Sequence, residues 1–342
     1  DMSKSLNIAL LGNPNTGKTS VFNALTGLSQ KVGNYPGITV EKKEGICKLN
    51  RTTKGHVLDL PGTYSLNASS MDESVVIELL LNRKSKDFPD VAVVVTDVEN
   101  LKRNLLLFTQ VKDLGIPTLL VINMADQMKR KGITLDIPVL EKAIDTKIAM
   151  VSTRENKGLQ ELKQLIINYR ELSTTATISI DSIDEEYFKN LEKIFQNQSL
   201  YKLWLVITQD VNFAKIDRKR VSDATDFKTE SPSNLKRLQQ KETVKRYQFI
   251  NNVLKQGLRV DREAATDLRS RFDRVLIHKF WGYIIFFVVL MTIFQSIFSW
   301  SSIPQDFIDN SFASLSQVLG EKLPAGVFTD LLTQGIVPGL GG

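Results

Sequence analysis

The chain has 342 residues, enough for about two or three domains with a substantial buried core. Its 44 Lys and Arg against 38 Asp and Glu give a net charge of +6, too small an excess to indicate nucleic acid as a partner. The single cysteine, Cys47, excludes an internal disulfide framework and a thiolate metal site. We therefore expect Cys47 to be a buried, small apolar residue, and we predict no zinc site built by the protein.

The first half of the chain alternates short apolar runs with amphipathic stretches, from Leu6 to about Tyr169. This pattern indicates βα units around a largely parallel, doubly wound sheet. The predicted strands are Asn7–Leu11, Val57–Leu60, Val91–Asp97, Thr118–Asn123 and Lys147–Ser152. The predicted helices are Ser20–Leu25, Glu73–Leu81, Leu101–Leu114 and Leu159–Tyr169. Such a sheet binds ligands at the carboxyl ends of its strands, where we expect the functional residues.

After Tyr169 the composition changes. Ser173–Thr177 is a small polar linker, and Asp184 to about Arg274 is rich in Lys, Gln, Asn and Glu with helical periodicity. The apolar residues expected to form its core are Phe188, Leu191, Ile194, Phe195, Leu203 and Trp204. Ser222–Asn234 is a predicted polar loop with no assigned chemistry. We therefore expect three domains, residues 1–172, 173–274 and 275–342.

An apolar run without a charged side chain extends from Phe280 to Trp300. About 20 apolar residues cross a bilayer as a helix, and aromatic rings such as Trp281 favour its interfaces. We predict a transmembrane helix at about 280–300; the alternative is a buried helix of a soluble protein. Basic residues before the run place residues 1 to about 279 in the cytoplasm by the positive-inside rule, namely Arg259, Arg262, Arg269, Arg271, Arg274 and Lys279. No signal peptide is visible after Asp1, and we expect the chain to be a piece of a longer membrane protein.

The strongest motif follows the first predicted strand and opens a helix. It matches G-x-x-x-x-G-K-[ST] and comprises Gly12, Asn13, Pro14, Asn15, Thr16, Gly17, Lys18 and Thr19, with Ser20 next. Its backbone N–H groups and the helix amino terminus attract phosphate, while Lys18 reaches the β and γ phosphates and the Thr19 hydroxyl binds Mg²⁺. The motif predicts a nucleotide site without saying which base is bound.

A second motif selects the base. Asn123, Met124 and Asp126 end a predicted strand, and a carboxylate there accepts hydrogen bonds from the guanine N1–H and N2–H₂ groups. Adenine lacks these donors and would leave the carboxylate unpaired. The usual Lys of such motifs is replaced by Met124. Capping of the guanine is expected from Val151, Ser152 and Thr153.

Two further segments are predicted to sense the γ-phosphate. Asp59, Leu60, Pro61 and Gly62 form a D-x-x-G motif whose Asp holds Mg²⁺ through water and whose Gly62 N–H contacts the phosphate. Thr39, after Gly37 and Ile38, is the expected switch threonine. Thr19, Thr39 and Asp59 would then surround Mg²⁺; an ordinary loop threonine is the alternative for Thr39.

The residues after Gly62 lack a glutamine. In many GTPases a Gln at this place orients the attacking water, whereas here Thr63, Tyr64 and Ser65 follow, so we expect slow hydrolysis. Asn15 is the candidate compensation, because its carbonyl oxygen could hold K⁺ beside the phosphates. A turn-forming Asn is the competing interpretation. The predicted catalytic residues are thus Asn15, Lys18, Thr39 and Gly62.

These motifs together resemble the ferrous iron transport protein B family. The resemblance rests on Gly12–Thr19, on Val32–Glu41, on Asp59–Leu66 and on Asn123–Asp126, and it continues through His278–Asp309. An aromatic residue, usually Trp in the family, is Tyr35 here. The resemblance implies a Ras-like α/β P-loop GTPase domain and an all-α domain similar to a guanine-nucleotide dissociation inhibitor, followed by the start of a membrane domain.

The resemblance also implies a function and partners. Members couple GTP or GDP binding with Mg²⁺, and often K⁺-stimulated hydrolysis, to Fe²⁺ uptake by a multi-pass domain of the bacterial inner membrane. It further implies small cytoplasmic Feo proteins as partners and leaves room for a homo-oligomer. Two alternatives stay open: a membrane-anchored regulatory or assembly GTPase without a transport role, and a soluble ribosome-assembly GTPase.

Overall fold

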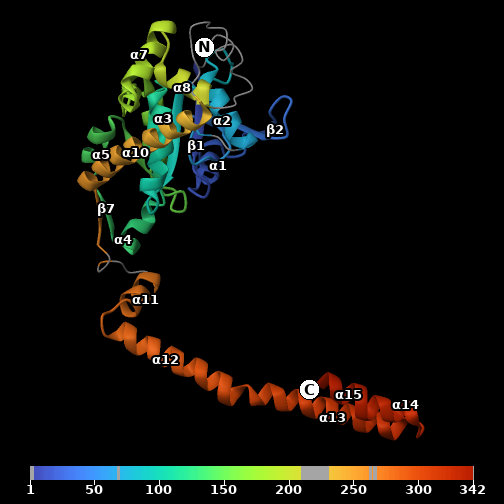
Figure 1. Ribbon diagram of the computed structural model, residues 1–342. Helices are drawn as coiled ribbons and strands as arrows, with labels where there is room; N and C mark the ends of the chain where they lie inside the picture. Colours follow the sequence, from blue (N-terminus) through green and yellow to red (C-terminus); the bar gives the residue numbers. More distant parts are fainter. Residues whose placement is uncertain (1–3, 68–69, 209–230, 262–263, 265–267, 342) are drawn as a thin grey trace. The chain divides into compact units, whose positions relative to one another are not determined.

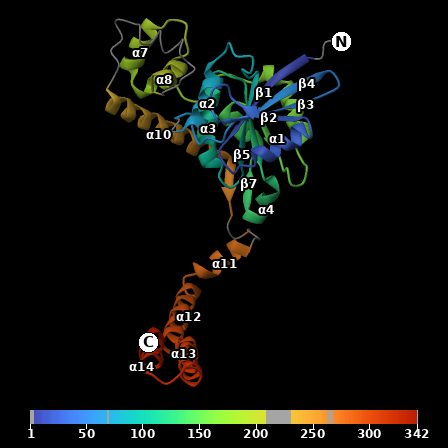
Figure 2. The ribbon, with the colours of Figure 1, turned by 90° about the vertical axis from the view of Figure 1, so that its right-hand side faces the viewer.

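The computed structural model describes residues 4–67, 70–208, 231–261, 264 and 268–341. The chain divides into two compact units, residues 1–267 and residues 268–342. In the first unit, helices lie on both faces of a central sheet (Figures 1 and 2). This arrangement agrees with the predicted α/β fold.

Within the described residues, the sheet has seven strands in the order β2-β3-β4-β1-β5-β6-β8. Their bounds are β1 Lys4–Gly12, β2 Gln30–Asn34, β3 Glu41–Lys48, β4 Thr53–Asp59, β5 Val91–Asp97, β6 Thr118–Asn123 and β8 Ile148–Met150. The strands from β4 to β8 in this order pair in parallel, whereas β2–β3 and β3–β4 pair antiparallel. The parallel part is as predicted, but the antiparallel edge was not predicted.

Each face of the sheet carries its own apolar core. On β1, Ile8 and Leu10 belong to the core shared with α1 (Lys18–Thr26) and α6 (Leu159–Ile167). Ala9 and Leu11 point to the opposite core, as alternation along a strand requires. That second core contains residues of α2 (Met71–Leu81), α3 (Leu101–Asp113) and α5 (Ile137–Ile144). Cys47 is buried in the first core, as predicted, and burial raises the pKa of its thiol.

A helical region continues the second core. It contains η3 (Ile180–Ile183), α7 (Glu185–Ile194), α8 (Leu200–Thr208) and α10 (Pro232–Gly257). Helix α10 packs against α3 and α5 (Figures 1 and 2). Five of the six predicted core residues are buried there, namely Phe188, Leu191, Phe195, Leu203 and Trp204. The prediction for Ile194 is wrong, because this last residue of α7 is 37% exposed.

Two short elements join the helical region to the α/β part. After η1 (Ala125–Gln127) and α4 (Met128–Lys131), strand β7 (Ile133–Leu135) pairs antiparallel with β9 (Leu258–Val260), which follows α10. The region expected to be entirely helical therefore contains one short strand. After α6, the turn η2 (Tyr169–Glu171) precedes the linker.

The predicted loop Ser222–Asn234 is partly wrong. Residues 222–230 lie outside the described part, but Pro232–Asn234 are the first turn of α10. Ser231 caps this helix, since its side chain accepts a hydrogen bond from Asn234 N at 3.3 Å. Proline suits the first helical turn, which has no use for its missing N–H. The proline that suggested a loop is thus a helix start.

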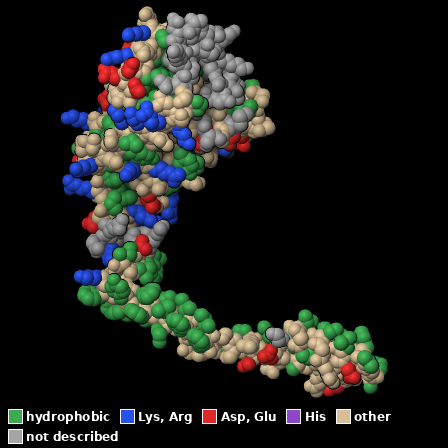
Figure 3. Space-filling model, viewed as in Figure 1, with side chains coloured by type: hydrophobic (Ala, Val, Ile, Leu, Met, Phe, Trp, Pro, Cys, Tyr) green, Lys and Arg blue, Asp and Glu red, His purple; other side chains and the backbone are tan. Residues whose placement is uncertain are grey.

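The second unit is built of helices. They are α11 (Leu268–Leu276), α12 (Trp281–Gln295), the π-helical segment Ser296–Trp300, α13 (Ser302–Lys322), α14 (Val327–Asp330), the π-helical segment Leu331–Ile336 and α15 (Val337–Gly341). Apolar side chains cover the exposed surface of α12 (Figure 3). The run Trp281–Lys322, 42 residues, is the one described helix that is long and apolar enough to cross a membrane. It extends past the predicted end at Trp300.

Candidate nucleotide-binding site

The loop Gly12–Thr19 joins β1 to α1, as its motif predicts. Gly17 has a φ of 80°, and a Cβ there would lie 2.2 Å from Asn123 Nδ2. A Cβ at Gly12 would lie 2.6 Å from the Val95 carbonyl oxygen. Only glycine fits at these two positions, so the backbone curls tightly between strand and helix. Within the loop, Thr16 Oγ1 donates to Asn13 O at 3.0 Å.

The predicted base-recognition residues meet this loop. Asn123, at the end of β6, donates from Nδ2 to Thr16 O at 3.1 Å. Two residues beyond the left-handed Met124 (φ 60°), Asp126 accepts a hydrogen bond from Ser152 Oγ at 2.8 Å. Ala125 N donates to Val151 O at 3.2 Å, and the half-buried Thr153 follows. The phosphate loop, the segment Asn123–Asp126 and the segment Val151–Ser152 are therefore joined by hydrogen bonds although they are distant in the sequence.

The predicted magnesium residues line a single cavity of about 300 Å³. Its lining comprises Lys18, Thr19, Thr39, Val40, Glu41, Lys43, Asp59, Leu60, Pro61 and Asp72. Lys18 Nζ forms an ion pair with Asp59 Oδ1, and both side chains are nearly buried. Two hydroxyls and a carboxylate are the hard oxygen ligands that Mg²⁺ prefers, so Thr19, Thr39 and Asp59 fit this ion.

Thr39 reaches the cavity from a tight turn between β2 and β3. Ile38 N donates to Tyr35 O at 3.2 Å, and Gly37 takes the positive φ of 80° that such a turn requires. The loop is closed by a hydrogen bond from Tyr35 N to Val40 O at 3.0 Å. Thr39 itself is exposed.

Tyr35 anchors the same loop, a role that the sequence did not indicate. Its hydroxyl is buried without a hydrogen-bond partner among the described residues. Burial, together with Asp87, Asp59 and Glu44, raises the pKa of Tyr35. The phenol therefore stays neutral beside the cavity. Lys42, which pairs with Asp87 at 2.8 Å, lies 6.0 Å from the centre of the Tyr35 ring.

The D-x-x-G segment lies against the phosphate loop. Leu60 N donates to Leu10 O, and Thr63 N donates to Gly12 O, both at 3.1 Å. A Cβ at Gly62 would come within 3.2 Å of Pro14 Cγ. Gly62 is therefore next to the loop whose ligand it is predicted to sense. Asn15, the predicted K⁺ ligand, is exposed and has a φ of 67°.

The loop also presents buried polar atoms. Both side-chain polar atoms of Asn13 and Oδ1 of Asn123 are buried, with no hydrogen-bond partner among the described residues. Buried polar groups normally have partners, so these atoms suit a site that receives a polar ligand. Sequence analysis assigned both asparagines to the site but did not show that they are buried. It missed Glu41, Lys43 and Asp72 of the cavity, because their charges look like an ordinary solvated surface.

Residues 6–166 match the family model described as "Ferrous iron transport protein B". The Fe(2+) transporter FeoB of Leptospira biflexa is 34% identical over 357 residues, which cover 99% of this chain and 50% of the relative. FeoB of Staphylococcus aureus strain MSSA476 is 32% identical over 359 residues, covering 98% and 52%. The chain spans about half the length of the curated relatives it matches.

Solved structures show the same likeness. The cytosolic domain of the T. maritima FeoB iron transporter in its apo form is 28% identical with a TM-score of 0.66, covering 75% of this chain and all of that one. Its GMPPNP form is 27% identical with a TM-score of 0.63, covering 75% and 99%. These alignments extend beyond the α/β part alone. With the phosphate loop, the D-x-x-G segment and the base-recognition residues in one site, the chain belongs to the ferrous iron transport protein B (FeoB) family.

Proposed function

We propose that this chain binds guanine nucleotide with Mg²⁺ and hydrolyses GTP. The observation that carries this proposal is the hydrogen bond from Asn123 to Thr16, with Asp126 held nearby by Ser152. These contacts support the proposal because they would hold a guanine-selecting carboxylate near a phosphate-binding loop. Solved relatives described as GDP and GMPPNP forms support the same ligand class.

The residues of the cavity have distinct tasks. Bound Mg²⁺ supplies positive charge that offsets charge on the phosphates, and Thr19, Thr39 and Asp59 would hold it. Lys18 must leave Asp59 to reach the β and γ phosphates, so nucleotide binding exchanges an internal ion pair for contacts with the ligand. Gly62 N–H would sense the γ-phosphate. Asn15 would hold K⁺ and compensate for the missing glutamine, which gives slow, K⁺-stimulated turnover.

We further propose that the chain is the cytoplasmic part and the first membrane helix of a bacterial Fe²⁺ uptake transporter. On this proposal, residues 1–172 form the GTPase domain, 173–274 the helical domain and 275–342 the start of a domain in the inner membrane. Relatives described as Fe(2+) transporters, and the apolar run Trp281–Lys322, support it. A Porphyromonas gingivalis relative described as a fusion with Fe(2+) transport protein A, 30% identical over 358 residues, supports a small Feo partner.

A nucleotide titration of the purified chain tests the first proposal. GTP and GDP should bind and ATP should not, because adenine leaves Asp126 unpaired. Equal binding of ATP, or no binding of GDP, would overturn it. Transport is tested separately, by comparing the iron-dependent growth of cells that carry the complete gene with that of cells that lack it. Equal growth of the two would favour a regulatory GTPase without a transport role.

A further inference from the structure

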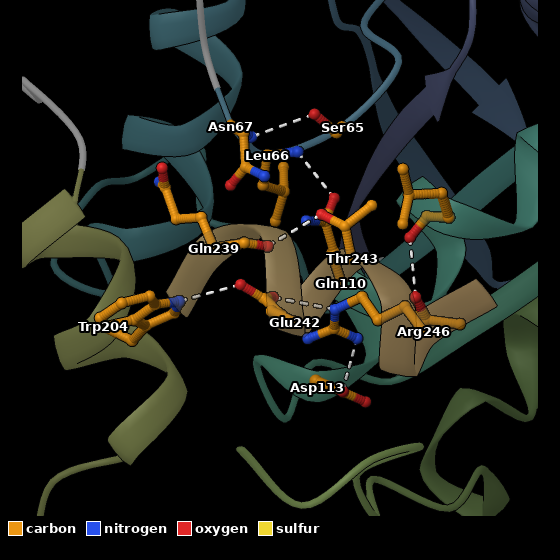
Figure 4. Close-up of polar contacts among 12 residues, drawn as sticks. Ser65, Leu66, Asn67, Gln110, Asp113, Trp204, Gln239, Glu242, Thr243 and Arg246 are labelled. Carbon is orange, nitrogen blue, oxygen red and sulfur yellow. Dashed lines mark hydrogen bonds and ion pairs between the residues drawn. The ribbon is translucent and has the colours of Figure 1, made fainter. Parts of the chain in front are cut away.

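Gln110 of α3 holds the chain segment that follows the D-x-x-G motif. Its Oε1 accepts a hydrogen bond from Leu66 N at 2.8 Å (Figure 4). Gln110 is 1% exposed and Leu66 is 0% exposed, so water cannot replace this bond when it is lost. Earlier in the segment, Thr63 N donates to Gly12 O of the phosphate loop. Residues 63–66 therefore connect the phosphate loop to one side chain of α3.

Asp113, three residues further along α3, engages the helical region. Its Oδ2 accepts from Arg246 Nη1 of α10 at 2.8 Å. Its Oδ1 accepts from Thr177 N and Thr177 Oγ1 at 2.6 and 2.8 Å. Residues three apart lie on the same side of a helix, so Gln110 and Asp113 share one face of α3.

A buried network extends from Asp113 to α8. Arg246 Nε donates to Glu242 Oε1 at 2.9 Å, and Trp204 Nε1 donates to Glu242 Oε2 at 2.9 Å (Figure 4). Arg246, Glu242 and Trp204 are each 0% exposed. Removing one partner of a buried ion pair leaves an uncompensated charge and is strongly destabilising. The network therefore connects α3, α8 and α10 through buried polar contacts.

The contacts of α3 that involve Gln110 and Asp113 differ in strength. The network from Asp113 to Trp204 is ionic and dehydrated, whereas Leu66 and Gln110 share one neutral hydrogen bond, the weaker kind. We propose that Gln110 is the positioning residue through which a displacement of Gly62 reaches the helical region. The Leu66–Gln110 bond forms in one nucleotide state and breaks in the other, and the network transmits the change to Trp204. This inference rests on the proposed GTP switch.

Trp204 provides the readout. The chain has three tryptophans, so Trp281→Phe and Trp300→Phe in the detergent-solubilised full chain leave Trp204 alone. Its emission is expected to differ between the GDP-bound chain and the chain bound to a nonhydrolysable GTP analogue. Gln110→Met keeps the size of the side chain but removes the acceptor. It should remove most of this difference, while GDP affinity changes by less than about threefold, because Gln110 lies outside the nucleotide site.

One further variant and one variant-free measurement make the test decisive. Gln164→Met, on the exposed face of α6, should retain the difference. In the parent chain, hydrogen exchange of the Leu66 amide should differ between the two nucleotide states, independently of whether a variant folds.

The outcomes separate the two proposals. A parent chain that binds no guanine nucleotide overturns the proposed function itself. If the parent chain binds both nucleotides but its Trp204 emission or its Leu66 hydrogen exchange is the same in the two states, the proposed function stands and only the role of Gln110 is overturned. The role of Gln110 is also overturned if Gln110→Met keeps the full difference in Trp204 emission between the two nucleotide states.

Discussion

Asn123 Nδ2 lies 3.1 Å from Thr16 O, so the strand that carries the base-recognition residues is fastened to the phosphate loop. The two residues are 107 positions apart in the sequence. On the proposed function, their contact would set the spacing between the two ends of a bound nucleotide. It also passes directly beside Gly17, where no side chain has room.

Gly17→Ala should therefore weaken nucleotide binding strongly. The added Cβ would lie 2.2 Å from Asn123 Nδ2 at a φ of 80°, and both the contact and the backbone would be strained. We expect GDP affinity to fall by about 100-fold or more, since the loop must move from its site. Titration with a fluorescent GDP measures this.

Gly115→Ala is the matched control. Gly115 has a φ of 76° and nothing within 4 Å of an added Cβ, so the backbone strain is similar and the collision is absent. GDP affinity should stay within about threefold of the parent, because Gly115 lies outside the site. Equal losses in both variants would show that backbone strain alone, and not the contact with Asn123, explains the effect.

Asp126→Asn should move the base preference from guanine to xanthine. The amide oxygen still accepts from N1–H, which both bases carry, but the amide NH₂ then faces the guanine amino group, donor against donor, whereas xanthine presents a carbonyl acceptor at that position. We expect a loss of about 100-fold for GDP relative to XDP, measured by competitive titration.

Ser152→Ala tests the support of that carboxylate. Without the 2.8 Å hydrogen bond, Asp126 is less well held, and GDP should bind about fivefold to tenfold more weakly with guanine still preferred.

If the relative affinities for GDP and XDP were the same in Asp126→Asn and in the parent, Asp126 would have no part in base selection.

Turnover of GTP should increase when K⁺ replaces Na⁺. The larger ion suits a ligand set of neutral carbonyl oxygens, to which Asn15 would contribute beside the phosphates. Asn15→Ala should remove the difference between the salts and leave the slow rate. Phosphate release measured at matched ionic strength checks this, and identical parent rates in both salts would rule out the cation.

Lys112 should make stability depend on pH. Its side chain is fully buried and donates to Thr175 O at 2.6 Å and Ser173 O at 3.3 Å. Burial lowers the pKa of Lys112 from 10.5. Between the lowered pKa and 10.5 the unfolded chain binds more protons than the folded chain, so the free energy of unfolding should rise with pH in this window.

Lys112→Met should lose this contribution. Urea unfolding followed by Trp204 emission at about pH 8 and about pH 10 measures the difference between parent and variant. Lys102→Met, at an exposed position of the same helix, is the control. Parallel pH dependences of the parent and Lys112→Met would contradict a buried, perturbed lysine.

The nucleotide motifs were predictable because each one is local. Gly12–Thr19 needs a strand before it and a helix after it, and both are visible as apolar patterns over neighbouring residues. The strands Val91–Asp97 and Thr118–Asn123 have the predicted bounds, because both are fully buried and read as continuous apolar runs.

The connections between distant segments were not predictable. Glu242 and Arg246 are four residues apart on a helix, a spacing that normally indicates an exposed ion pair, and only the packing of α3 and α8 buries them. Lys112 is a second example, because a lysine on a helix is normally exposed, whereas here its side chain is fully buried. The strand β2 was missed because all five of its residues are exposed and show no apolar alternation.

That exposed strand has a consequence for the region around Thr39. Strands β2 and β3 form an antiparallel ribbon at the border of the sheet, and the turn that carries Thr39 connects them. The outer strand has a neighbour on one side only and contributes little to either apolar core. It can detach and re-anneal while the central strands stay paired. The turn that is proposed to sense the phosphate is thus joined to the part of the sheet that opens locally at the lowest cost, while the central strands keep the fold.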